Sequence, residues 1–191
     1  FKNFPFNSIY NYSDNNYPKP SQYTTFWKYL IYVSICKQMV HDKNINSEIR
    51  DTLAKLFPTT ASTKRLKNLI PKITVKEFGF QVLSTGLNIG MDRDKHELSW
   101  IDIADILENV ILENVSSDSK YYVIFDELDE EYKDFTSKDE KEDYFALITS
   151  LFKAVNETRN IFKDEGLLIY PIVFLRSDIF QRINYSDKNK W

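Results

Sequence analysis

Apolar residues recur along the chain in two patterns, one with the spacing of helices and one in short unbroken runs. Between Ser21 and His41 they occupy most sides of a predicted helix, which is typical of a helix that is buried all round. Two shorter helical patterns follow at 47–56 and 62–69, and Pro58 separates them. We therefore expect three helices in the first third of the chain, after an irregular entry over the first twenty residues.

The pattern changes between Ile73 and Met91, where apolar residues are interrupted by glycines. This alternation predicts a β-hairpin or small β-insertion at about 71–92. A helix is expected next, because Ser99 with Asp102 resembles a capped helix start and apolar residues then recur at helical spacing as far as Ile111.

The second half of the chain predicts a strand, a helix and a second strand. Tyr121–Phe125 is a short continuous apolar run, typical of a strand buried on both faces of a parallel sheet. Ser137 with Glu140 forms a capping-box pattern at the start of an amphipathic helix. The run Leu167–Leu175 predicts the second strand, although Pro171 is awkward in a central strand. Such a βαβ unit is normally right-handed with parallel strands, so the fold class is α/β.

Composition indicates one folded domain. The 191 residues are 42% hydrophobic and 28% charged, and the net charge of −3 provides no overall field for binding nucleic acid. A local basic stretch is the one feature that favours nucleic acid, and more often such a stretch is a solvated face. It comprises Lys64, Arg65, Lys67, Lys72 and Lys76.

The sequence predicts a cytoplasmic protein. Its longest apolar stretch, Tyr29 to Cys36, is bounded by lysines and is far shorter than the roughly 20 residues of a membrane-spanning helix. Cys36 is the single cysteine, which suits a reducing compartment. No Cys or His cluster has the spacing of zinc ligands.

Candidate chemistry follows the first strand. Asp126 and Glu127 come directly after the apolar run, where the carboxyl end of a strand meets solvent. Asp126 is suited to orienting Mg²⁺ through water, and Glu127 to polarising a water for attack on a γ-phosphate. Asp129 is a second, weaker metal candidate. The alternative is structural, because acidic residues are common between a sheet edge and the next helix.

A cation follows the second strand. Arg176 is expected to emerge beside the acidic pair, where it would sense a γ-phosphate and stabilise charge that develops during phosphoryl transfer. The alternative is a structural ion pair of Arg176 with Asp126 or Asp178.

These two segments resemble motifs of a known group. Tyr122–Asp129 looks like a Walker B strand. Phe174–Phe180, followed by Asp187–Lys190, resembles the sensor-1 region of bacterial P-loop ATPases related to the AAA+, STAND and KAP groups. The resemblance implies an incomplete three-layer P-loop NTPase-like parallel sheet with a β-hairpin insertion, and it implies ATP and Mg²⁺ as ligands.

The same resemblance assigns roles to individual residues. Asp126 would coordinate Mg²⁺ and Glu127 would activate water. Arg176 or Ser177 would act as the sensor, with Asp178 in a supporting position on the nucleotide-binding side.

The phosphate-binding loop of such an enzyme is not present in this sequence. Its pattern Gly-x-x-x-x-Gly-Lys-Ser/Thr does not occur around any of the four glycines, which are Gly79, Gly86, Gly90 and Gly166. We expect 1–191 to be a partial P-loop ATPase domain that is inactive alone, with the loop encoded upstream of Phe1. In the parent protein, ATP hydrolysis would switch an oligomer or an assembly with protein partners.

Two other functions stay open. A Mg²⁺-dependent nuclease or phosphohydrolase would use Asp126, Glu127 and Asp129 as a carboxylate cluster. A non-catalytic interaction domain would keep the ATPase fold only as a scaffold.

Overall fold

The computed structural model describes residues 19–58, 100–129, 132 and 137–183. The helix expected at 62–69, the β-insertion at about 71–92 and the basic stretch lie outside these residues. The described elements are α2 (Lys19–Met39), α3 (Ser47–Leu56), α5 (Trp100–Asn114), β1 (Lys120–Phe125), α6 (Lys138–Asp164), β2 (Leu168–Val173) and α7 (Ser177–Arg182).

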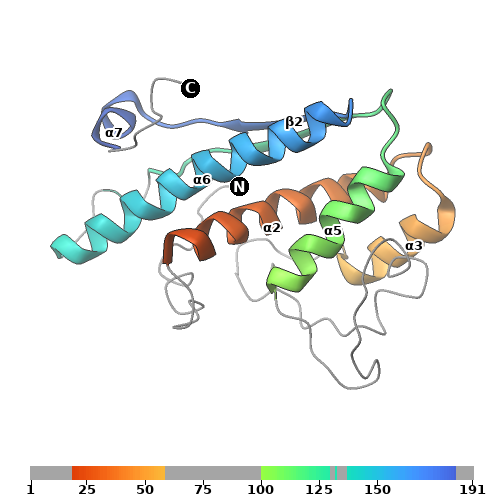
Figure 1. Ribbon diagram of the computed structural model, residues 1–191, viewed down its shortest axis with the longest axis horizontal. Helices are drawn as coiled ribbons and strands as arrows, with labels where there is room; N and C mark the ends of the chain where they lie inside the picture. The colour runs from red at the N-terminus through yellow and green to blue at the C-terminus, as the bar shows by residue number, and fades with distance from the viewer. Residues whose placement is uncertain (1–18, 59–99, 130–131, 133–136, 184–191) are drawn as a thin grey trace, which may run out of the picture.

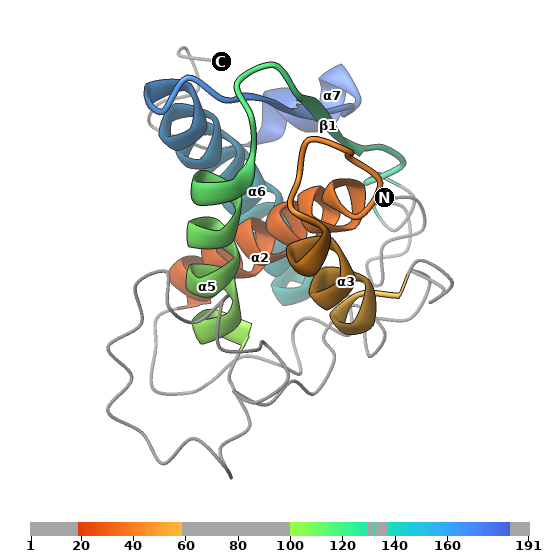
Figure 2. The same ribbon diagram turned by 90° about the vertical axis from the view of Figure 1, so that its right-hand side faces the viewer.

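Helix α2 is at the centre of the fold. It packs against α6, α5, α3 and β1, and in Figure 1 the sheet lies above α2 and α6 while α5 and α3 lie below them. In Figure 2, α5 is seen to the left and α3 to the right, with α2 between them. The buried residues of α2 face all these neighbours, so the prediction that this helix is buried on most sides is confirmed.

Trp27 joins three of these elements. Its side chain is fully buried, and its indole Nε1 donates a hydrogen bond to the carbonyl oxygen of Leu147 in α6 at 2.9 Å. The rings of Trp27 and Phe125 of β1 pack edge to face, with their centroids 5.6 Å apart. The last residue of β1 is therefore packed directly against the central helix.

The two described strands are parallel, as predicted, and are paired from Lys120 with Leu168 to Phe125 with Val173. They form a two-stranded sheet in a mixed α/β fold that consists mostly of helices. Strand β2 ends earlier than expected, because the chain turns into α7 with Arg176 as the N-cap residue.

Pro171 is tolerated because of its place in the parallel ladder. The N–H of Phe174 points to β1, where it donates to the carbonyl oxygen of Phe125. Backbone N–H groups alternate in direction along a strand, so the position of Pro171 faces the outer edge of β2. The missing N–H of this proline therefore removes no hydrogen bond to β1.

The two faces of the sheet differ. Tyr121, Val123 and Phe125 are buried, whereas Tyr122 and Ile124 are 51% and 47% exposed. The expectation that β1 is buried on both faces is therefore wrong for the structure described here. Large apolar side chains of both strands share the exposed face, and the rings of Tyr122 and Tyr170 stack with centroids 5.3 Å apart.

Side chains near the end of α2 fix the position of β1. The Gln38 amide donates to the carbonyl oxygen of Tyr122 at 3.1 Å and accepts from the Tyr122 N–H at 3.4 Å, so it occupies the outer edge of the strand. The Tyr121 hydroxyl donates to Asp42 Oδ2 at 2.6 Å. Asp42 Oδ1 also accepts from the Asn44 N–H at 2.9 Å, which closes the turn after α2.

Helix α6 begins with the predicted capping box. Ser137 Oγ accepts from the Glu140 N–H at 3.1 Å, and Glu140 Oε2 accepts from the Ser137 N–H at 3.3 Å. These bonds satisfy two backbone donors that the first turn of a helix leaves without partners. Among the described helices, none contains a stretch that is both long and apolar enough to cross a membrane.

Candidate functional site

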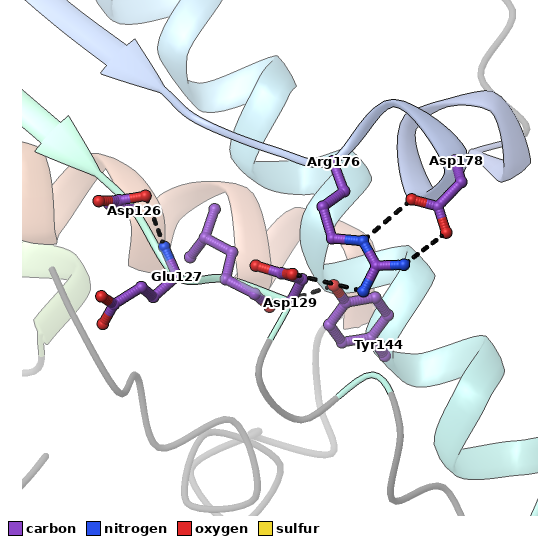
Figure 3. Close-up of polar contacts among 7 residues, drawn as sticks. Asp126, Glu127, Asp129, Tyr144, Arg176 and Asp178 are labelled. Atoms are coloured by element: carbon purple, nitrogen blue, oxygen red, sulfur yellow. Dashed lines mark hydrogen bonds and ion pairs between the residues drawn. The ribbon is translucent and has the colours of Figure 1, made fainter.

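Polar residues follow both strands at the same edge of the sheet (Figure 3). The Phe174 N–H donates to the carbonyl oxygen of Phe125 at 2.8 Å, one residue before Asp126 and two residues before Arg176. This hydrogen bond fixes the relative position of the two strand ends. Arg176 was expected beside Asp126 and Glu127, and its contacts are instead with Asp129 and Asp178.

The loop after β1 has a strained backbone at Glu127. This residue has φ = 58°, in the left-handed region, and is the one described non-glycine residue with a positive φ. A left-handed conformation costs a residue with a Cβ about 1–2 kcal/mol. The Glu127 N–H donates to Asp126 Oδ1 at 2.9 Å, which stabilises the turn locally. Sequence analysis did not find this feature, since no Gly or Asn marks the position.

The next residue anchors the loop in the core. The side chain of Leu128 is fully buried, and its carbonyl oxygen accepts a hydrogen bond from the Tyr144 hydroxyl of α6 at 3.1 Å. Tyr144 is itself fully buried. The loop that carries the candidate carboxylates is therefore attached to the start of a long, capped helix.

Arg176 contacts two carboxylates. Its Nε and Nη2 donate to the two oxygens of Asp178 at 3.1 and 2.9 Å, and its Nη1 lies 3.7 Å from Asp129 Oδ2. The hydrogen bonds with Asp178 raise the pKa of Arg176 and lower the pKa of Asp178. One structural alternative, the Asp178 pair, is thus present, and Asp129 rather than Asp126 is the second partner.

The candidate carboxylates point in different directions. In Figure 3 the Glu127 carboxylate points away from Arg176, whereas Asp129 points toward it. The Arg176 side chain is 44% exposed, so an anion from solvent can reach it in spite of its partners. Ser177 is exposed at the first position of α7, next to this arginine.

A second contact ties α7 to the same loop. The Arg182 guanidinium donates to the Tyr132 hydroxyl and lies over the Tyr132 ring, 5.8 Å from its centroid. Arg176 and Arg182 stand at opposite ends of α7. The loop after β1 therefore contacts this helix at both ends. No local sequence signal marks the Arg182 contact.

The candidate carboxylates do not form a metal-binding cluster in the part of the chain that the structure describes. Within the described residues, no group of three His, Cys, Asp or Glu side chains is arranged to hold a metal ion. Asp129 faces Arg176, so its role as a metal ligand stays a prediction. Mg²⁺ in nucleotide sites is commonly held by one or two carboxylates together with water and phosphate oxygens, so the role of Asp126 as a Mg²⁺ ligand stays a prediction as well.

Comparisons with protein-family models, with curated proteins and with solved structures found no match to this chain. The resemblance to P-loop ATPases therefore rests on the residues themselves and on their arrangement.

Proposed function

We propose that this chain contributes the Mg²⁺-binding and water-activating part of a P-loop ATPase domain. The observation that carries the proposal is the shared sheet edge, where an acidic pair follows β1 and Arg176 follows the adjacent parallel strand β2. Ligands of parallel α/β sheets bind at this edge, outside the carboxyl ends of the strands.

Three side chains have distinct chemical roles in this proposal. Asp126 would hold Mg²⁺, which would supply positive charge against the negative charge that develops during phosphoryl transfer. Glu127 would accept a hydrogen bond from the attacking water and orient it. Arg176 would neutralise charge on the transferred phosphoryl group, for which a planar guanidinium is well suited.

The position of Arg176 supports a sensing role. It is half-exposed and held by two carboxylates, so its guanidinium is oriented before an anion arrives. A phosphate group would compete with Asp129 and Asp178 for the same N–H donors. Ser177 and Asp178 then complete the nucleotide side of the site at the start of α7.

The three-layer P-loop fold is part of the proposal. The exposed apolar face of the sheet supports it, because parallel strands are usually covered by helices on both faces. Phosphate contacts require a Gly-x-x-x-x-Gly-Lys-Ser/Thr loop from outside these 191 residues. Reading the coding sequence upstream of Phe1 tests this requirement directly.

The decisive experiment measures Mg²⁺-dependent phosphate release from ATP by the full-length protein. Glu127→Gln should lower kcat by at least about a hundredfold and leave binding of a fluorescent ATP analogue intact. Glu142→Gln, at an exposed position of α6, is the matched control and should change neither quantity. Wild-type hydrolysis that Glu127→Gln does not reduce would refute the assignment of Glu127.

The same preparation discriminates the other functions. Cleavage of DNA with Mg²⁺ or Mn²⁺ in the absence of ATP would favour the nuclease. A full-length protein that neither binds nor hydrolyses ATP, and that keeps its biological activity with Glu127→Gln, would be a non-catalytic interaction domain.

A further inference from the structure

We infer that Tyr144 is a positioning residue for Glu127, because its hydroxyl holds the loop after β1 in the strained conformation that directs the Glu127 carboxylate. The inference rests on the proposed function for the role of Glu127. It concerns a buried tyrosine on α6, 17 residues further along the chain, which no catalytic step uses directly.

The strain at Glu127 has to be balanced by its surroundings. A left-handed residue with a Cβ persists only where the neighbouring structure fixes it, and such residues cluster at functional sites. One fixed point is local, since the Glu127 N–H is bonded to Asp126 Oδ1. A local bond of this kind moves with the loop and cannot fix the loop relative to the sheet. A second anchor from another element is needed.

Tyr144 supplies that anchor. Its hydroxyl donates to the carbonyl oxygen of Leu128, the residue directly after Glu127, at 3.1 Å. The Tyr144 side chain is fully buried, and its ring lies against Tyr132, with centroids 5.7 Å apart. Helix α6 is capped at Ser137 and bonded to α2 through Trp27, so the hydroxyl is held on a rigid element.

Loss of this hydrogen bond has a specific consequence. The loop then keeps only the buried Leu128 side chain as an anchor, and the backbone of Glu127 can relax toward a negative φ. The carboxylate would move away from the position where it orients water, while Asp126 and Arg176 would stay in place. The rate of ATP hydrolysis would therefore fall, while the affinity for ATP would stay unchanged.

The first test is a double-mutant cycle on stability, measured by urea unfolding of the full chain. Glycine adopts φ = 58° without strain. In the wild type, Tyr144→Phe removes a stabilising hydrogen bond, but it also lets the strained backbone of Glu127 relax, which offsets part of the loss. In the Glu127→Gly background the backbone is already unstrained, so nothing offsets the loss of the hydrogen bond. Tyr144→Phe should therefore lower the unfolding midpoint more in the Glu127→Gly background than in the wild type. Equal decreases in both backgrounds would overturn the inference.

The second test is kinetic and uses the full-length protein with ATP. Tyr144→Phe should lower kcat about tenfold, as expected for a loss equivalent to one hydrogen bond in the transition state, and leave KM unchanged. Tyr32→Phe is the matched control, because Tyr32 is also buried and its hydroxyl donates to Glu108, between α2 and α5. An equal loss of kcat in the control, or a change confined to KM, would overturn the inference.

The two tests separate the possible failures. A wild-type protein that does not hydrolyse ATP refutes the proposed function, and the stability cycle then still decides whether Tyr144 holds the Glu127 backbone. A protein that hydrolyses ATP but shows additive stability effects refutes the positioning role alone.

Discussion

The Phe174 N–H donates a hydrogen bond to the carbonyl oxygen of Phe125 at 2.8 Å, and this bond continues the ladder between the two strands just past its last residue pair. It sets the distance between the chain segments that leave the sheet. Asp126 follows directly on one side and Arg176 follows two residues later on the other. The relative placement of the candidate carboxylates and the arginine is thus decided by backbone pairing before any side chain makes a contact.

Glu127→Gly should make the protein more stable while it removes the proposed function. Glycine has no Cβ and adopts φ = 58° without strain, so we expect the free energy of unfolding to rise by about 1 kcal/mol. Urea unfolding of the variant and the wild type measures this difference.

Glu142→Gly is the matched control for that prediction. Glu142 lies in the first turns of α6, where glycine costs about 1 kcal/mol relative to a good helix former. The same substitution should therefore have opposite signs at the two positions. A decrease in stability at both would show that the Glu127 backbone is not strained.

Trp27→Phe should weaken the junction of α2, α6 and β1. The variant loses the hydrogen bond from the indole to Leu147 and part of the buried ring that contacts Phe125. We expect the free energy of unfolding to fall by about 2 kcal/mol. Thermal or urea unfolding checks the value. A change below about 0.5 kcal/mol, the usual range for a surface site, would contradict the packing described here.

The elements that local chemistry specifies were predicted from the sequence. The capping box at Ser137 and Glu140 marks the start of α6, and the helix at 47–56 has the predicted bounds. Parallel pairing of the two strands followed from the order strand, helix, strand. Parallel pairing puts the residues after both strands at one edge of the sheet, but it did not predict that Arg176 would contact Asp129.

The features that sequence analysis missed depend on contacts between distant residues. The exposed face of β1 was not predicted, because an apolar run does not show how many faces of a strand other elements cover. The left-handed backbone at Glu127 could not be predicted, because the position is not occupied by glycine or asparagine. The Tyr144 bond to Leu128 joins residues 16 positions apart, and no local sequence pattern marks it.

Gln38→Ala should expose the outer edge of β1. The Gln38 amide occupies both backbone groups of Tyr122, and without it the N–H and carbonyl oxygen become available to another strand. Exposed strand edges promote association between chains. Sedimentation velocity over a range of concentrations should show more self-association than in the wild type. Lys43→Ala, at an exposed turn position, serves as the control, and equal behaviour of the two variants would contradict the role of Gln38.

Asp42 should make stability depend on acid pH. Burial raises the pKa of Asp42, but the combined effect of hydrogen bonds from Ser119, Tyr121 and the Asn44 N–H is larger and lowers it. A carboxyl group with a lowered folded-state pKa contributes stability above its unfolded pKa of about 3.9. That contribution is lost as pH falls through the lower folded-state value.

Asp42→Asn tests this pH dependence. At pH 7 the variant should be less stable than the wild type by about 1 kcal/mol, since the hydrogen bonds to a charged acceptor are weakened. The difference should begin to shrink below about pH 4, where Asp42 of the unfolded chain becomes protonated, and should be smallest below the lowered folded-state pKa. Urea unfolding at pH 7, 5 and 3 measures the trend. A difference that stays constant across this range would show that the Asp42 charge does not stabilise the turn between α2 and α3.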